Sequence, residues 1–225
     1  MKAVILAAGR GSRLKPLTDK TPKPLLRVNG KTLLEHNLDL VKKIVDEYII
    51  VVGYMSDAII DFLGSEYAGK GVRYVEQKEL LGTGHALYTC KEYLPDDFLV
   101  LNSDDLFAKE DIEKLIPYKF SILSKEAESD FSGGKINVDQ SDKLVEIVEG
   151  DHKRGDLVNV GVYKMHADIF NYDLVKIPGR EEYGLPQTII SVLRDDDIKI
   201  KKANFWIQIN DIEGLERARA YLNRK

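Results

Sequence analysis

Residues 2–8 read KAVILAA and run directly into the glycine-rich turn GRGSR of residues 9–13. Six consecutive apolar residues after Lys2 are typical of a strand that is buried on both faces of a parallel sheet. Glycines after such a strand let backbone amides approach a phosphate without a Cβ clash. Open α/β sheets bind their ligands at this end of the strands. The stretch therefore predicts an α/β fold with a phosphate site in its first loop.

Apolar runs and amphipathic stretches continue to alternate up to about residue 105. Further strands are expected at residues 47–54, 72–77 and 97–104, and helices at residues 32–44, 56–67 and 82–94. Strands that are almost continuously apolar and alternate with helices indicate a parallel sheet with helices on both faces. We therefore expect a Rossmann-like, three-layer α/β/α arrangement.

The pattern changes after about residue 120. Strands are expected at residues 120–125, 134–139, 144–149 and 157–165, with glycine-containing turns between them. This section should be more antiparallel, and we interpret it as a flap over the site. A helix at 185–196, a strand at 198–209 and a helix at 211–225 complete the chain. Since no linker or repeat divides the sequence, residues 1–225 are expected to form a single domain.

Composition narrows the classes of partner. The net charge of −4 and the isoelectric point near 5.7 argue against a nucleic-acid-binding protein. No apolar run approaches the roughly 20 residues that span a bilayer, and the amino terminus lacks the features of a signal peptide. We expect a cytoplasmic protein without membrane or nucleic-acid partners; its oligomeric state stays open, homo-oligomers included. Cys90 is the single cysteine, which excludes an intrachain disulfide and CxxC-type sites, and we expect it to be buried on a helix.

Positive charge is concentrated in the first 31 residues, which hold eight Lys or Arg and one acidic residue, Asp19. A cationic pocket beside an amide-rich turn suits a polyphosphate. The turn matches neither GxGxxG nor GxxxxGK[ST], and an ordinary turn with exposed basic residues is the alternative. Pro22 and Pro24 hold Lys23 on a stiff segment, which suits an ammonium that must keep its position, although a rigid surface loop would look the same.

The run LAAGRGSRLKPLTDKTPKPLLRVNGKTLLEH of residues 6–36 resembles the opening signature of the sugar-1-phosphate nucleotidyltransferases. Residues 77–87, QKELLGTGHAL, resemble the nucleobase loop of this family, particularly of its N-acetylglucosamine-1-phosphate uridylyltransferase branch. The resemblance implies that Gln77 and the backbone of Gly82 read a uracil or thymine edge, and an amide does offer the matching donor and acceptor. The nucleotide contacts it implies are Leu6, Ala8, Gly9, Gly11, Ser12, Gln77, Gly82 and Thr83.

Two further segments resemble the metal-binding segments of the family. LVLNSDDLF, residues 99–107, is similar to its L-x-G-D strand end and implies that Asp104 binds Mg²⁺, with Asp105 the less favoured ligand. An Asp-Asp turn that ends a strand is the alternative. FWIQINDIEGLERA, residues 205–218, implies Asn210 as the second ligand. Asp211 is the fallback, although a helix N-cap is its favoured role. Ser103 and Gln208 depart from the commonest family residues, which are glycine and aspartate.

The resemblance to the sugar-binding positions is weaker. Gly134, Glu149 and Asn159 match these positions in order and spacing, whereas GLPQTI at 184–189 departs from the usual LTD-like sequence. The implied fold is that of the nucleotide-diphospho-sugar transferases. Its central sheet is mostly parallel, with an antiparallel section in the second half. Residues 1 to about 110 form a nucleotide-binding half and residues from about 111 to 225 a sugar-binding half.

The implied activity is the Mg²⁺-dependent transfer of a nucleotidyl group from UTP or dTTP to a sugar 1-phosphate, with release of pyrophosphate. Arg13 and the turn would hold the departing pyrophosphate, Lys23 would neutralise the α-phosphate, and Asp104 would act through the metal. N-acetylglucosamine 1-phosphate, N-acetylmuramic acid 1-phosphate and glucose 1-phosphate are all open as acceptors. A CTP-dependent enzyme for a phosphorylated sugar or for an alcohol such as phosphocholine, and an inactive subunit that senses nucleotide sugars, are the alternatives.

Overall fold

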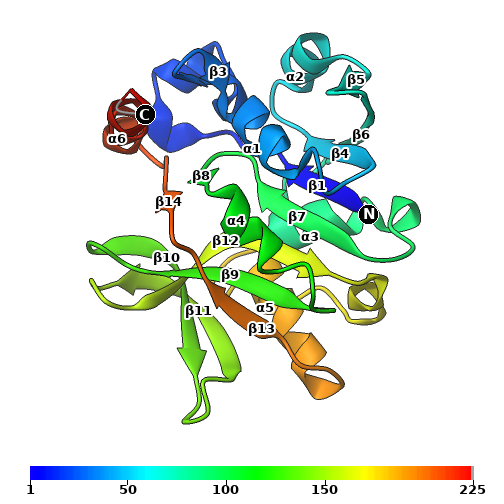
Figure 1. The fold of residues 1–225 in the computed structure, drawn as a ribbon, viewed down its shortest axis with the longest axis vertical. Helices are drawn as coiled ribbons and strands as arrows, with labels where there is room; N and C mark the ends of the chain where they lie inside the picture. Colours follow the sequence, from blue (N-terminus) through cyan, green and yellow to red (C-terminus); the bar gives the residue numbers. More distant parts are fainter. Residues whose placement is uncertain (224–225) are drawn as a thin grey trace.

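The computed structural model describes residues 1–223 and is built around a ten-stranded mixed sheet (Figure 1). Its first half holds four parallel strands in the order β7 (Phe98–Asn102), β1 (Lys2–Leu6), β4 (Glu47–Val52) and β6 (Lys70–Glu76). The short β5 (Glu66–Tyr67) adds to β6 as an antiparallel edge. Leu6 pairs with Val51 on one side and with Asn102 on the other. The carboxyl ends of the strands therefore meet at one edge of the sheet.

The second half of the sheet is mainly antiparallel. The long β12 (Leu157–Met165) lies antiparallel to β7 and joins the two halves. It also pairs with β9 (Ser121–Glu126) and β10 (Phe131–Val138), and β10 continues to β11 (Leu144–His152). β13 (Lys199–Lys202) runs parallel to β9. The expected α/β fold with a parallel first half and an antiparallel section in the second half is confirmed.

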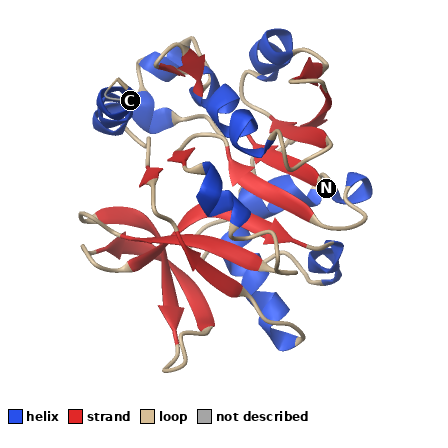
Figure 2. Cartoon of the chain, viewed as in Figure 1, coloured by secondary structure: helices blue, strands red, loops and turns tan. Residues whose placement is uncertain are grey.

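Alternate side chains of a strand point to opposite faces of the sheet, so each central strand contributes to a core on either face. In the first strand and its extension, Ala3, Ile5 and Ala7 belong to one core and Val4, Leu6 and Ala8 to another. The first core is covered by α1 (Leu33–Val41), α2 (Ser56–Leu63) and α4 (Lys109–Glu113), and the second by α3 (Thr83–Tyr88) and α5 (Leu185–Ile189). Figure 2 shows helices on either side of the strands, which is the expected three-layer arrangement.

A third, smaller core joins the segment of residues 14–33 to the carboxyl-terminal part of the chain. Leu14 and Val28 from the amino-terminal segment pack with Ile209 and Leu215 near the carboxyl terminus. The helix α6 (Ile212–Leu222) thereby contacts β2 (Arg27–Val28), which pairs with β3 (Lys31–Thr32); Figure 1 labels α6 and β3. The pair of β8 (Leu106–Phe107) and β14 (Trp206–Ile207) continues this contact. This core places residue 210 next to the loop that carries Lys23.

Several expected elements end earlier than their sequence patterns indicate. The expected helix 56–67 stops at Leu63, because Gly64 adopts φ 69° and the chain turns back into β5. The expected helix 82–94 is α3 followed by a 3-10 turn at Lys91–Tyr93, and that at 185–196 is α5 followed by a 3-10 segment at Ile190–Arg194. The last helix ends at Leu222, and residues 224–225 lie outside the described chain. The remaining 3-10 helices are Ser12–Leu14, Leu17–Asp19, Lys23–Leu25 and Ala167–Asn171.

The expected single strand 198–209 is broken. β13 ends at Lys202 and β14 begins at Trp206, because the backbone N–H groups of Asn204 and Phe205 donate to the Asp111 carboxylate at 2.8 and 3.0 Å. This buried side chain turns the chain away from the large sheet and toward the third core. Within residues 1–223, no helix has the length and hydrophobicity needed to cross a membrane.

Candidate active site

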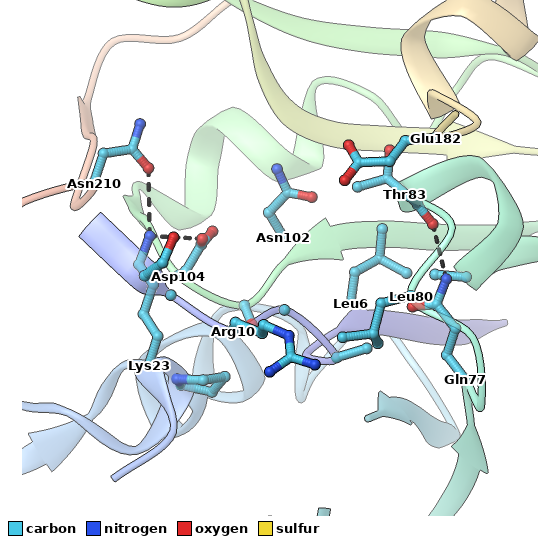
Figure 3. Close-up of a pocket in the computed structure, with 18 of the residues that line it drawn as sticks. Leu6, Arg10, Lys23, Gln77, Leu80, Thr83, Asn102, Asp104, Glu182 and Asn210 are labelled. Carbon is cyan, nitrogen blue, oxygen red and sulfur yellow. Dashed lines mark hydrogen bonds and ion pairs between the residues drawn. The ribbon is translucent and has the colours of Figure 1, made fainter. Parts of the chain in front are cut away.

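A cavity of about 540 Å³ opens at the carboxyl ends of β1 and β7 (Figure 3). All twelve residues that the sequence assigned to nucleotide, catalysis or metal line it: Leu6, Ala8, Gly9, Gly11, Ser12, Arg13, Lys23, Gln77, Gly82, Thr83, Asp104 and Asn210. Other lining residues, among them Arg10, Asn102, Ile177 and Glu182, were not predicted from the sequence. Ile177 and Glu182 come from a loop at least 90 residues away from the nucleobase loop in the sequence, so no local pattern could have assigned them.

The turn after β1 presents a row of unused backbone donors. The N–H groups of residues 9–13 donate no hydrogen bond to any of residues 1–223. Gly11 takes φ 61°, and a Cβ at this position would lie 2.9 Å from the Cβ of Lys23. The Thr18 hydroxyl donates to the Gly11 carbonyl at 2.9 Å and holds the turn from behind. A concave run of free N–H groups beside the exposed Arg13 can bind an anion such as a polyphosphate.

Lys23 reaches the cavity from the stiff segment that its neighbouring prolines predict. Pro22 is extended, at φ −62° and ψ 143°, and Lys23 opens a 3-10 turn. The Lys23 residue is only 6% exposed, so its ammonium is held among protein groups. Its Nζ contacts Asp104 Oδ2 at 2.7 Å and Asn210 Oδ1 at 3.4 Å (Figure 3). Three segments that are far apart in the sequence therefore converge on one point.

The two oxygens at this point fit a magnesium site. A carboxylate and an amide oxygen are hard ligands, and Mg²⁺ commonly takes one or two protein ligands together with waters and substrate phosphates. Within residues 1–223, no three His, Cys, Asp or Glu residues gather as a more complete metal site. As expected, Asp211 is the N-cap of α6, and its carboxylate accepts from Gly214 N at 2.7 Å. Of Asn210 and Asp211, Asn210 is therefore the residue that faces the cavity.

Asp105 is buried and serves the site indirectly. Its carboxylate accepts from Ile209 N at 2.9 Å and from Trp206 Nε1 at 3.0 Å. Burial raises the pKa of Asp105, and the nearby charge of Asp104 raises it further, whereas Lys23 acts in the opposite direction. Both oxygens are engaged, and they fasten the segment before Asn210 to the strand end that carries Asp104. Asp105 therefore sets the position of both oxygens that face Lys23.

The other end of the cavity is formed by the loop between β6 and α3. Gln77 is buried there, and its Nε2 donates to the Gly82 carbonyl at 3.0 Å and contacts His85 Nδ1 at 3.0 Å. Its Oε1 has no donor within residues 1–223 and points to the interior of the cavity beside Leu80 (Figure 3). Thr83 does not cap the helix: Gly82 is the N-cap, and the Thr83 hydroxyl accepts from Leu185 N at 3.0 Å.

This loop is clasped to residues 183–185. Tyr183 N donates to the Leu81 carbonyl at 2.7 Å, and Gly84 N donates to the Tyr183 carbonyl at 2.9 Å. Gly82 has φ 95°, and a Cβ there would lie 2.5 Å from the Tyr183 carbonyl oxygen. The glycines of GTG are therefore required by a close approach of two segments that are a hundred residues apart. The clasp fixes the position of Gly82, on which the orientation of Gln77 depends.

The three residues expected at the sugar site gather away from the cavity wall. Gly134 and Glu149 are paired between β10 and β11, and a Cβ on Gly134 would lie 3.1 Å from Glu149 Oε1 and 3.6 Å from the Asn159 Cβ. None of the three is among the lining residues. The Asn159 amide bonds Tyr163 at 2.6 Å and Gly161 N at 3.1 Å, and Gly161 packs tightly on the lining residue Asn102. Gly134, Glu149 and Asn159 therefore lie close together, and their contact with a sugar substrate stays a prediction.

Cys90 takes no part in this site. It is fully buried, and burial raises the pKa of its thiol to about 12. A thiol that stays protonated is not a nucleophile, so Cys90 serves the core, as its sequence context indicates.

Comparison with known proteins gives consistent matches along the chain. The family model described as "Nucleotidyl transferase" matches residues 2–224. A bifunctional protein GlmU of Methanocaldococcus jannaschii is 32% identical over 99% of the chain, which spans 54% of that protein's length. A UTP–glucose-1-phosphate uridylyltransferase, AglF, of Haloferax volcanii is 31% identical over 86% of the chain and 84% of its own length.

A solved structure agrees with these matches. A putative glucose-1-phosphate thymidylyltransferase of Bacillus anthracis, in complex with sucrose, superimposes with a TM-score of 0.84. It is 26% identical, and the alignment covers 98% of this chain and 94% of that one.

Proposed function

The chain belongs to the nucleotidyl transferase family, and on this premise we propose that it transfers a nucleotidyl group from a nucleoside triphosphate to a sugar 1-phosphate. One observation carries the proposal: a single cavity joins the free N–H groups of residues 9–13, the cluster of Lys23, Asp104 and Asn210, and the Gln77 amide. A triphosphate, its reacting phosphorus and its base would each find a partner along this cavity. The names of the Haloferax relative and of the superimposed Bacillus structure, both glucose-1-phosphate enzymes, support the choice of a sugar phosphate as the acceptor.

In the proposed reaction an oxygen of the sugar phosphate forms a bond to the α-phosphorus. The bond between the α-phosphorus and the bridging oxygen breaks, and pyrophosphate leaves toward the N–H groups of residues 9–13 and Arg13. The acceptor phosphate is already an anionic nucleophile at neutral pH, so no protein base has to remove a proton. The Lys23 ammonium neutralises charge on the α-phosphate. Catalysis of this kind relies on positioning and on charge stabilisation.

Mg²⁺ would be held by Asp104 and Asn210, and when bound it would supply charge neutralisation between the α-phosphate and the incoming phosphate. Lys23 lies against both ligands, at 2.7 and 3.4 Å, so it also orients them. Their buried neighbour Asp105 keeps the two segments together. These residues therefore form one unit, and a change in any of them should affect the others.

The orientation of Gln77 supports UTP or dTTP as the donor. Its Oε1 faces the cavity and can accept a hydrogen bond from the ring N–H of uracil or thymine. Cytosine presents an unprotonated ring nitrogen at the same edge, so it would face Oε1 with an acceptor. Guanine also carries a ring N–H, so this contact does not distinguish it from uracil or thymine. The structure thus favours the uridylyl or thymidylyl reaction over the cytidylyl alternative.

The reaction class, the base and the acceptor can be tested together by measuring pyrophosphate release with Mg²⁺. The matrix combines UTP, dTTP, CTP, GTP and ATP with N-acetylglucosamine 1-phosphate, N-acetylmuramic acid 1-phosphate, glucose 1-phosphate and phosphocholine. We expect the largest signal from UTP or dTTP with one sugar 1-phosphate. Turnover of CTP with phosphocholine would replace the proposal. Binding of nucleotide sugar without pyrophosphate release would identify a regulatory subunit instead.

On the acceptor side, Glu149→Gln is expected to raise KM for the sugar phosphate by about 10-fold or more, since an ionised acceptor of sugar hydroxyls contributes about 1.5–3 kcal/mol. KM for the nucleotide should stay within about twofold. Steady-state kinetics with each substrate varied in turn measures both values. Glu146→Gln, on the exposed face of the same strand, is the matched control. An unchanged acceptor KM in folded Glu149→Gln would remove Glu149 from the sugar site.

A further inference from the structure

His85 is not among the residues that line the cavity, yet it contacts the group proposed to read the base. The Gly82 carbonyl can only accept a hydrogen bond, so its 3.0 Å contact with Gln77 requires Nε2 to lie on that side of the amide. The second hydrogen of the same Nε2 then points to His85 Nδ1, also at 3.0 Å. Because the Gln77 Nε2 is the donor in this contact, His85 Nδ1 is the acceptor.

We propose that His85 is the positioning residue that sets base selectivity by holding the Gln77 amide with Oε1 toward the cavity. This inference rests on the proposed function, because it assumes that Gln77 faces the base. A glutamine amide is nearly symmetric in shape, and a half-turn about its last bond exchanges oxygen and nitrogen. The shape of the pocket alone therefore cannot decide which of the two atoms the base meets.

Two acceptors on one side of the amide decide this orientation. In the reversed orientation Oε1 would face both the Gly82 carbonyl and Nδ1, which replaces two hydrogen bonds by two contacts between acceptors. Gln77 is only 4% exposed, so little water is available to compensate for these losses. Gly82 contributes one acceptor, which the clasp to Tyr183 holds in place. His85, in the first turn of α3, contributes the other.

The consequence for specificity follows from the chemistry of the base edges. With the amide held, the cavity presents an acceptor and selects a base that carries a ring N–H. With the amide free to rotate, the NH₂ group can turn to the cavity and donate to the unprotonated ring nitrogen of cytosine. Loss of the His85 acceptor should therefore admit CTP, while the reaction itself, at the far end of the cavity, remains intact.

The test compares kcat/KM for the preferred nucleotide with kcat/KM for CTP in wild type, His85→Phe, His85→Leu and His85→Asn. Phe and Leu remove the acceptor, and measuring both guards against one variant that does not fold. The Asn side-chain oxygen can take the place of Nδ1. We expect the ratio to fall at least 10-fold in Phe and Leu, mainly through KM, and to stay within about threefold of wild type in Asn. Circular dichroism checks folding.

A second pair of variants tests whether His85 acts through the orientation of the Gln77 amide or only through its packing. The Gln77→Glu side chain presents an oxygen in either orientation. The double variant Gln77→Glu/His85→Phe should therefore have the same ratio of the two kcat/KM values as Gln77→Glu alone. An unchanged ratio in folded Phe or Leu variants would overturn the role of His85, and so would an equal fall in the Asn variant. If wild type itself shows no preference for a base with a ring N–H over CTP, the proposed donor is wrong. That outcome is distinct from a failure of the His85 inference alone.

Discussion

Lys23→Ala is expected to lower kcat for pyrophosphate release by about 10²- to 10³-fold, the usual cost of removing one group that stabilises charge in a transition state. The ammonium lies 2.7 Å from Asp104 and 3.4 Å from Asn210 on a segment stiffened by proline, so no other lysine can take its place. Steady-state kinetics at saturating substrate measures the effect, because a group that acts in the transition state changes kcat rather than KM alone.

Lys20→Ala is the matched control for this variant. Lys20 is exposed, lies three residues earlier in the same basic segment, and makes no ion pair with any of residues 1–223. It should retain kcat within about twofold. If Lys23→Ala is folded and turns over at near the wild-type rate, Lys23 is not part of the mechanism. A similar loss in both variants would point to the general charge of the segment instead.

Asp104→Asn is expected to reduce activity by at least about 10²-fold and to weaken binding of a divalent ion measured without substrate turnover. An amide is a poorer ligand than a carboxylate for a hard cation, and Asn210 already supplies the neutral oxygen. Binding can be followed with Mn²⁺ by electron paramagnetic resonance. It can also be followed by the fluorescence of Trp206, the single tryptophan, which donates to the adjacent Asp105.

Asp104→Asn should also lower the free energy of unfolding when no ligand is present. The Lys23 ammonium is almost fully buried and would lose its carboxylate partner, which is expected to cost about 1–3 kcal/mol of unfolding free energy. Thermal unfolding measures this loss. Asp61→Asn, at an exposed position of α2 that makes no ion pair or side-chain hydrogen bond with residues 1–223, is the control and should change neither stability nor ion binding. Normal ion binding by Asp104→Asn would exclude Asp104 as a ligand.

The sequence by itself determined the parallel half of the fold and the two segments, residues 9–13 and 22–24, that bring positive charge and free amides to the cavity. Residues 3–6 of the apolar run after Lys2 form a doubly buried strand, and the glycines that follow the run form the turn with free amides. The prolines around Lys23 produced the stiff segment that was expected. These features could be predicted because they depend on local causes: side-chain alternation, backbone freedom at glycine and ring constraint at proline.

The tertiary structure decided what depends on contacts between distant residues. The Asp111 carboxylate broke an expected strand at residues 203–205, and Asp105 fastened residues 206–209 beside Asp104. The orientation of Gln77 required His85 and a Gly82 that Tyr183 holds in place. Such contacts leave no periodic trace in the sequence, since they arise only when packing brings the segments together. Local chemistry thus predicted the turn and the stiff segment at the site, and the fold determined which of their atoms face the cavity.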